Sequence, residues 1–207
     1  MINIKVGGIT ELKQLTQLDG LNIEFAGLDF YAESPWYMKD KLPVTELRST
    51  DFDTKKVGVF LNAGFDEIMQ TVEDYDLDVV QLNGEESPEF CEQLSETLEV
   101  IKAFNIDKNT SFEELIADFD EVCDYYQFTI ASKKGAGSSG FDWKLFNKIK
   151  IEKPFFISDT IRPEDSAKVK SFVHPDFFGI HINSQFEKSA GVKDMVSILQ
   201  FKKALKK

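Results

Sequence analysis

Short apolar runs alternate with amphipathic segments along the whole chain. Eight of these runs are rich in aliphatic, β-branched and aromatic residues, as expected for parallel strands that are buried on both faces. The predicted strands are residues 2–6, 23–31, 56–61, 78–82, 100–104, 126–131, 155–158 and 178–182.

The segments between these runs carry helical patterns of varying strength. Residues 65–75 have apolar side chains at helical spacing, which predicts a helix there. Ser87, Pro88 and Glu89 combine a capping side chain, a first-turn proline and an acid, so a helix is expected to begin at this point. Further helices are predicted over residues 162–173 and 192–205, whereas the polar segment 38–53 is expected to be partly irregular.

Strands that alternate with helices predict the α/β class and a (β/α)₈ TIM barrel. The length of 207 residues suits one such barrel, and no linker, short-period repeat or low-complexity tract divides the chain. Residues 1–207 are therefore predicted to form a single domain. On pattern alone, a doubly wound open sheet is the alternative.

Composition narrows the classes of partner. The formal net charge of −12 argues against nucleic acid and against anionic membrane surfaces, both of which would repel the protein. Hydrophobic residues make up 42% of the chain, and 19 phenylalanines indicate a core rich in rings. The chain has neither a signal-peptide pattern nor an apolar run near the ~20 residues that span a bilayer, so we expect a cytoplasmic protein. Both a monomer and a homodimer are compatible with these features.

The cysteines and histidines do not suggest a metal centre. Cys91 and Cys123 match no metal-binding spacing, and His174 and His181 form no HExxH arrangement. Buried free thiols are expected, and neither a metal nor a cofactor is predicted. His174, next to a proline, is expected to lie in a surface loop.

Several motifs follow one another in a characteristic order and spacing. They are Lys5-Val6-Gly7-Gly8-Ile9-Thr10, Val79-Val80-Gln81-Leu82 with Gly84, Ile101-Lys102-Ala103, Phe141-Asp142-Trp143 and Gly191-Val192-Lys193-Asp194. Taken together, they resemble the phosphoribosylanthranilate isomerase family of tryptophan biosynthesis. The resemblance covers essentially the whole chain and implies a barrel that acts on a small phosphorylated substrate.

The resemblance also implies a mechanism, from which this sequence departs. The family reaction is an Amadori rearrangement that needs a general base and a general acid. The family base is a cysteine of the first strand, and its position here is Gly7. The family acid is an aspartate after the sixth strand, and its position here is Ala131. Each such group is typically worth ~10²–10⁴-fold in rate, so the loss of both should remove most of the activity.

Binding positions implied by the resemblance have changed as well. Trp36 replaces an arginine that would face the anthranilate carboxylate, and the glycine pair after strand seven is replaced by Asp159 and Thr160. The glycine-rich loop 135–140 has lost its lysine. The predicted ligand cleft comprises Trp36, Asn83, Asp159, His181, Asn183 and Ser184.

Three hypotheses follow from these departures. The first is a barrel whose native catalysis is lost or redirected, and which binds a small ligand, phosphorylated sugars included, or a partner. The second is an isomerase with substitute acid and base groups drawn from Asp29, Asp159 and His181. The third is a remodelled enzyme in which Asp159 and His181 form the acid–base pair. The alternative to the third hypothesis is a purely structural contact between these two side chains. The direction of the Asp29 side chain is left open, because the parity of the strand that carries it is uncertain.

Overall fold

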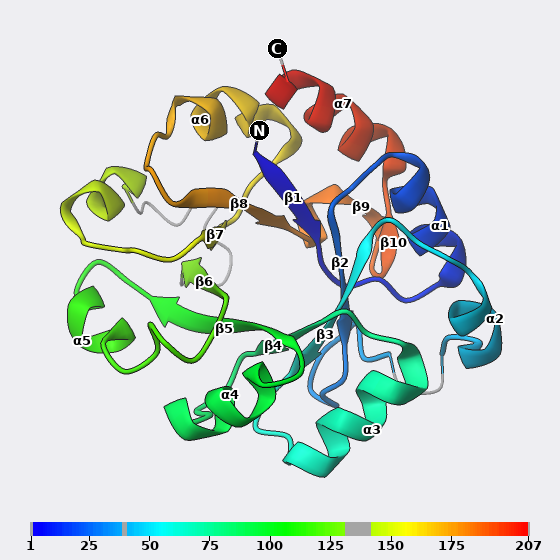
Figure 1. Ribbon diagram of the computed structural model, residues 1–207. Helices are drawn as coiled ribbons and strands as arrows, with labels where there is room; N and C mark the ends of the chain where they lie inside the picture. Colours follow the sequence, from blue (N-terminus) through cyan, green and yellow to red (C-terminus); the bar gives the residue numbers. More distant parts are fainter. Residues whose placement is uncertain (1, 39–40, 131–141, 207) are drawn as a thin grey trace.

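Eight parallel strands close into a barrel in the computed structural model of this protein (Figure 1), in the order β1-β2-β3-β4-β5-β6-β7-β8. The structure describes residues 2–38, 41–130 and 142–206. β1 pairs with both β2 and β8, which confirms the predicted barrel and excludes the open sheet. The strands are β1 Asn3–Val6, β2 Phe25–Asp29, β3 Lys55–Phe60, β4 Val79–Leu82, β5 Glu99–Ile106, β6 Tyr125–Ile130, β7 Phe155–Ser158 and β8 Phe177–Ile182.

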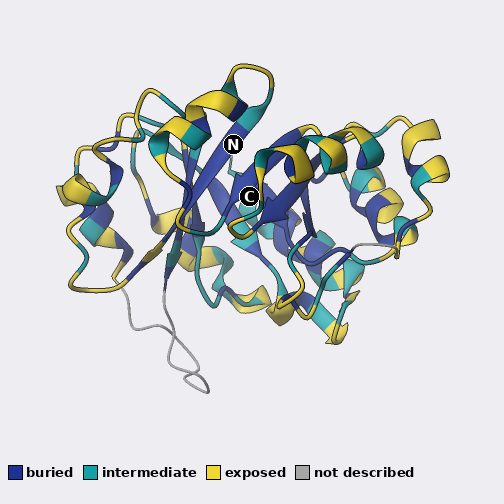
Figure 2. Ribbon diagram, turned by 90° about the horizontal axis from the view of Figure 1, so that it is seen from below, coloured by how far each residue is buried: buried dark blue, intermediate teal, exposed yellow. Residues whose placement is uncertain are grey.

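Helices surround the barrel and turn their exposed faces outward (Figure 2). A small antiparallel hairpin of β9 (Glu187–Ser189) and β10 (Val192–Lys193) follows β8. The helical elements are α1 Leu12–Gly20, α2 Val44–Ser49, α3 Phe65–Tyr75, α4 Pro88–Ser95, α5 Phe112–Ile116, η1 Trp143–Lys148, η2 Pro163–Asp165, α6 Ser166–Ser171, η3 Ser184–Phe186 and α7 Met195–Lys206.

The predicted helices are confirmed with shifted ends. Residues 65–75 coincide with α3, and the Ser87 hydroxyl caps α4 by accepting a hydrogen bond from the Phe90 amide at 3.3 Å. The helix expected from residue 192 begins at Met195, because residues 192 and 193 pair with β9. Segment 162–173 divides into η2 and α6.

The prediction of a surface position for His174 is wrong. Its side chain is only 5% exposed. The ring contacts Phe155 edge-on at 5.0 Å between centroids, and Nδ1 accepts a hydrogen bond from the amide of Asp176. Local polarity suggested a loop, but the aromatic core beneath that loop could not be read from the neighbouring residues.

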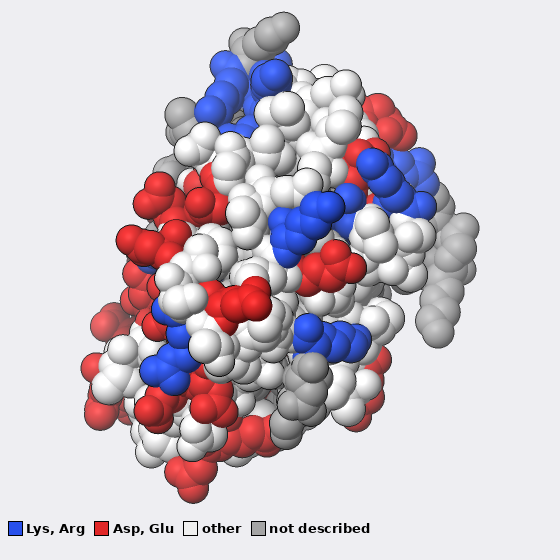
Figure 3. All heavy atoms as spheres, turned by 90° about the vertical axis from the view of Figure 1, so that its right-hand side faces the viewer, with Lys and Arg blue, Asp and Glu red and all other residues white. Residues whose placement is uncertain are grey.

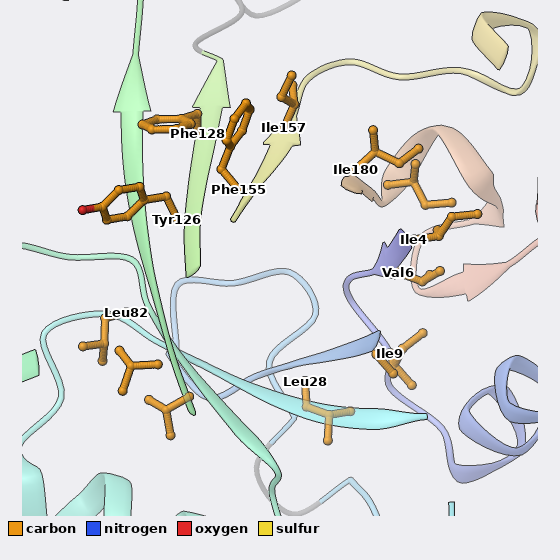
Figure 4. Close-up of a cluster of buried hydrophobic side chains, with 14 of the residues drawn as sticks. Ile4, Val6, Ile9, Leu28, Leu82, Tyr126, Phe128, Phe155, Ile157 and Ile180 are labelled. Carbon is orange, nitrogen blue, oxygen red and sulfur yellow. The ribbon is translucent and has the colours of Figure 1, made fainter. Parts of the chain in front are cut away.

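Two apolar layers hold the barrel, one on each side of the sheet. The outer layer packs the strands against the helices and includes Val6, Leu28, Leu82, Phe128 and Phe155 (Figure 4). The inner layer fills the barrel towards the amino ends of the strands. Its buried members are Phe25, Val57, Val59, Val79, Ile101 and Phe156. Because side chains alternate between the faces of a strand, membership of a layer shows which way each strand residue points.

The two cysteines are not joined in a disulfide bond. Cys91 and Cys123 are free and buried, as predicted, and burial raises the pKa of their thiols to about 11 and about 12. On the face shown in Figure 3, basic side chains gather towards the end of α7 and acidic ones towards α3. Within the described ranges, no helix is long and apolar enough to cross a membrane.

Candidate functional site

A polar layer lies inside the barrel, above the inner apolar layer and towards the carboxyl ends of the strands. Lys5, Asp29, Gln81 and Gln127 belong to it, and each is no more than 6% exposed. His181, on β8, pairs in register with Lys5. Active sites of TIM barrels lie at this end, so this layer is the floor of the candidate site.

His181 fills the space that a side chain at position 7 would need. A Cβ placed on Gly7 would lie 2.2 Å from Nε2 of His181 and 3.1 Å from its Cε1. The Gly7 backbone is itself fixed, because its amide donates to the carbonyl of Ile182 at 2.9 Å. Any residue larger than glycine at position 7 therefore requires His181 to move.

The imidazole of His181 is held in a defined orientation. Its Nδ1 lies 3.0 Å from Oγ of Ser158, the last residue of β7. Burial lowers the pKa of His181 well below its usual value, and the charges of Lys5 and Lys193 lower it further. The ring is thus neutral at pH 7. In the tautomer whose Nδ1–H donates to Ser158, Nε2 keeps a lone pair on the side of Gly7.

Lys5 begins a chain of polar contacts across the floor. Its Nζ donates to Oε1 of Gln81, and Nε2 of Gln81 donates to Oδ1 of Asn83 at 2.7 Å. Asn83, one of the predicted cleft residues, is thereby joined to the floor. Burial lowers the pKa of Lys5 to about 7, while the carboxylate of Asp29 acts in the opposite direction. Lys5 therefore titrates near neutrality.

The direction of Asp29, left open by the sequence, is now clear. Leu28 belongs to the outer layer and Phe25 to the inner one, so Asp29 points into the barrel. Its Oδ2 accepts a hydrogen bond from the Ser34 hydroxyl at 2.5 Å. Burial raises the pKa of Asp29, and the Ser34 hydrogen bond and the charge of Lys5 oppose this rise.

Trp36 lies over Gly8, just after β1. A Cβ on Gly8, whose φ is +67°, would lie 2.7 Å from Cγ of Trp36. The indole Nε1 donates to Oε1 of Glu187 at 2.8 Å, and Nζ of Lys193 donates to the same oxygen at 2.6 Å. Lys193 also donates to Oδ1 of Asn183. We call the four residues Trp36, Glu187, Lys193 and Asn183 the Trp36 cluster.

The sequence reasoning missed Glu187 and Lys193. Lys193 belongs to the motif Gly191-Val192-Lys193-Asp194, and its side chain is completely buried. The β9–β10 hairpin brings Lys193 next to Glu187. The residues around these two positions show neither a strand pattern nor a helix pattern, so the sequence does not predict the hairpin.

Asp159 directly follows β7 and His181 lies on the neighbouring β8, but the described contacts give the two side chains different partners. Ser158, which precedes Asp159, pairs in register with His181 and takes its hydrogen bond. Oδ2 of Asp159 instead accepts from Nε1 of Trp143 and from Nζ of Lys168, each at 3.0 Å. These contacts do not support the acid–base pair of the third hypothesis.

The remaining candidates add little to the geometry. Ser184 is exposed in η3, and its carbonyl accepts from the amide of Glu187. Ala131 and the loop 135–140 lie outside the described residues. Across residues 2–38, 41–130 and 142–206, no three His, Cys, Asp or Glu side chains are grouped so as to hold a metal ion.

Comparison with known proteins identifies relatives along nearly the full chain. Residues 4–204 match the family model described as N-(5'-phosphoribosyl)anthranilate (PRA) isomerase. The N-(5'-phosphoribosyl)anthranilate isomerase of Parabacteroides distasonis is 38% identical over 204 residues, covering 96% of this chain and 90% of that protein. The corresponding protein of Phocaeicola vulgatus is 29% identical, with 98% and 97% covered.

Solved structures agree. Phosphoribosyl anthranilate isomerase from Thermotoga maritima superposes with a TM-score of 0.83 at 26% identity, covering 100% of this chain and 99% of that one. A structure of phosphoribosyl anthranilate isomerase in complex with reduced 1-(o-carboxyphenylamino)-1-deoxyribulose 5-phosphate gives a TM-score of 0.81 at 25% identity, with the same coverage.

Proposed function

This chain belongs to the N-(5'-phosphoribosyl)anthranilate isomerase family, and we propose that it keeps the family barrel as a small-molecule binding site while the native isomerisation is lost or redirected. The ligand enters at the carboxyl ends of the strands, above the polar floor of the barrel. The family acts in tryptophan biosynthesis, and this member has diverged from that reaction at its proton-transfer positions.

One observation carries the proposal. The family base position, Gly7, has no side chain, and the nearest imidazole atom lies 2.2 Å from where a Cβ would be. The loss of the base is therefore built into the packing, because His181 has taken up the space. Reversion to a cysteine would require the His181 imidazole to move away from its present position.

The surroundings of the cleft support the same proposal. Trp36 stands where an arginine would bind a carboxylate, and its indole is committed to Glu187. The positive charge of Lys193, which lies 5.5 Å from the centre of the Trp36 ring, is paired with Glu187 at 2.6 Å. An anthranilate carboxylate would meet a flat ring and an already neutralised lysine at this point.

The test is turnover of freshly made phosphoribosylanthranilate, followed by the loss of its anthranilate-type fluorescence. We expect a rate no faster than that of buffer, in a sample whose folding is confirmed by circular dichroism. An isomerase from a characterised family member serves as the positive control for the substrate. Turnover at a rate typical of an enzyme contradicts the proposal.

A second candidate, an active isomerase with His181 as substitute base, is favoured by one specific observation. A neutral imidazole, oriented by Ser158, has Nε2 where the side chain of residue 7 would project. This candidate requires turnover by the wild-type protein and a loss of ~10²–10⁴-fold in His181→Ala. Gln93→Ala, at an exposed position of α4, is the control and should retain the wild-type rate.

A further inference from the structure

Lys5, Gln81 and Asn83 form a hydrogen-bonded chain that runs from the centre of the barrel to its rim. Lys5 is 0% exposed and Gln81 is 1% exposed, so bulk water does not reach their polar groups. Nζ of Lys5 donates to Oε1 of Gln81, and Nε2 of Gln81 donates to Oδ1 of Asn83 at 2.7 Å. Each amide therefore turns its oxygen towards Lys5 and its nitrogen away from it.

The charge of Lys5 dictates the direction of this chain. An ammonium group has donors and no acceptor, so the neighbouring amide of Gln81 must offer its oxygen. The nitrogen of Gln81 is then left for Asn83, which must in turn offer Oδ1. The rotation of both amides therefore follows from the proton on Lys5.

The amide nitrogen of Asn83 is directed at the cleft. Val79, two residues before Gln81, belongs to the inner layer, so the side chain of Gln81 and its partner Asn83 lie inside the barrel. Asn83 is half-buried, and it lines a cavity of about 360 Å³ with Ala103 and Asn105 at the ends of β4 and β5. Within the described residues, the side chain of Asn83 makes one hydrogen bond, through Oδ1, so both N–H groups of Nδ2 remain for a ligand.

We propose that the proton on Lys5 sets the hydrogen-bond polarity of Asn83 through Gln81, so that Asn83 presents donors to the cleft and selects a ligand atom that accepts. Carbonyl, carboxylate and ether oxygens fit this position, whereas an ammonium group does not. The statement about the ligand rests on the proposed function, because it takes the cleft as the binding site. Lys5 and Gln81 are positioning residues, and Asn83 determines specificity. When Lys5 loses its proton, its lone pair can accept from Gln81, and neither amide is then held in one rotation.

Two titratable groups face Lys5 from neighbouring strands. The carboxylate of Asp29, on β2, favours the charged lysine, whereas burial disfavours it and lowers the pKa of Lys5 to about 7. His181, on β8, pairs in register with Lys5 and is neutral at pH 7, because its own pKa is well below the usual value. The ring of Phe156, on β7, lies 5.8 Å from Nζ and carries no charge. The change between the two states of the chain therefore falls near neutral pH.

The first test follows the side-chain amide signals of Gln81 and Asn83 by NMR as the pH is raised through neutrality. The signals are identified by their absence from Gln81→Met and Asn83→Ala. We expect both amides to change chemical shift with a shared midpoint near pH 7, and we expect this titration to vanish in Lys5→Met. A titration that belongs to Asp29 would instead survive in Lys5→Met.

An Asn83 amide signal that does not change with pH in the wild type overturns the proposal, as does a midpoint that persists in Lys5→Met. Should Lys5→Met not fold, the midpoint of the Asn83 amide is compared with that of the Lys5 Cε signal in the wild type. Equal midpoints support the proposal, and different midpoints overturn it.

The second test uses Gln81→Glu, which keeps the shape of the side chain and removes its donor. A carboxylate accepts on both sides, so Asn83 must turn and donate Nδ2–H to it. The amide protons of Asn83 should then exchange with water about tenfold more slowly than in the wild type. Gln127→Glu is the matched control, because Gln127 is 2% exposed on β6 and its Nε2 donates to Thr129 instead, at 3.3 Å.

Unchanged exchange of the Asn83 amide in Gln81→Glu overturns the proposal, and so does an equal slowing in Gln127→Glu. Should Gln81→Glu not fold, the titration of the wild type decides alone. Both tests use the free protein and need no turnover, so their failure is distinguishable from that of the proposed function.

Discussion

Substitution of Gly7 by alanine tests the steric relation between Gly7 and His181 directly. Real Cβ contacts lie at 3.0 Å or beyond, whereas this one would be 2.2 Å, so the imidazole must retreat by 3.0 − 2.2 = 0.8 Å or more. Its Nδ1 hydrogen bond to Ser158, at 3.0 Å, resists that movement. Overpacking of this kind costs about 1–3 kcal/mol. Replacing glycine by alanine also lowers the conformational entropy of the unfolded chain, which stabilises the fold by about 0.4–1 kcal/mol, so the net loss is about 0–2.6 kcal/mol.

The expected result is a lower melting temperature for Gly7→Ala, by about 2–4 °C for each kcal/mol lost in a domain of this size. In the His181→Ala background the clash is absent, so the same substitution should become neutral or stabilising. The two positions should therefore couple by about 1–3 kcal/mol in a double-mutant cycle measured by urea unfolding.

Gly20→Ala is the matched control. A Cβ at Gly20 meets nothing within 4 Å, so the substitution should be neutral or stabilising in both backgrounds, without coupling to residue 181. The reasoning is refuted if Gly7→Ala is as stable as Gly20→Ala. It is equally refuted if Gly7→Ala loses the same free energy whether or not His181 is present.

Three further predictions concern buried ionisable groups. Burial lowers the pKa of Lys5 to about 7, so between pH 7 and about 10 the unfolded chain binds one proton more than the folded chain. The stability of the wild type relative to Lys5→Met should therefore rise with pH in this range, by up to about 1.4 kcal/mol per pH unit. A difference in urea unfolding that does not change with pH would contradict this. Lys102→Met leaves the buried carboxylate of Glu86 without its 2.8 Å ion pair and should lower the stability of the fold by about 3–5 kcal/mol. The double variant Lys102→Met with Glu86→Gln should lose less stability, and equal losses in thermal unfolding would show that the pair is not coupled. Cys91 and Cys123 should react with a thiol reagent only after unfolding, because burial raises the pKa of both thiols, and rapid labelling of the native protein would count against this.

The barrel could be predicted from the sequence because its signals are local. Each strand is a short apolar run, and the Ser87-Pro88 pair marks the start of α4 through its own side chain. The start of α7 was predicted less accurately, because a tertiary contact decides where this helix begins. Lys193 leaves the helical pattern because it pairs with β9.

The candidate site was predicted in its positions but not in its contacts. Sequence order placed Asp159 and His181 at the ends of neighbouring strands, and in the structure Asp159 directly follows Ser158, the β7 residue that pairs with His181. It could not show that Ser158 takes the imidazole hydrogen bond, nor that Trp143 reaches Asp159 from an element 16 residues earlier. Such contacts depend on rotamers and on loop paths, which have no periodic signature in the chain.

The seam between β1 and β8 has a consequence for folding. It joins residues about 175 positions apart, as in the hydrogen bond from the side-chain Nδ2 of Asn3 to the backbone carbonyl of Phe178. The Trp36 cluster also joins residues that are far apart in the sequence, with 151 positions between Trp36 and Glu187. Contacts of this range form late, because a long loop must be closed before they contribute. During synthesis, one edge of β1 therefore stays unpaired until β8 has left the ribosome. The contact between Gly7 and His181 is then among the last parts of the barrel to assemble.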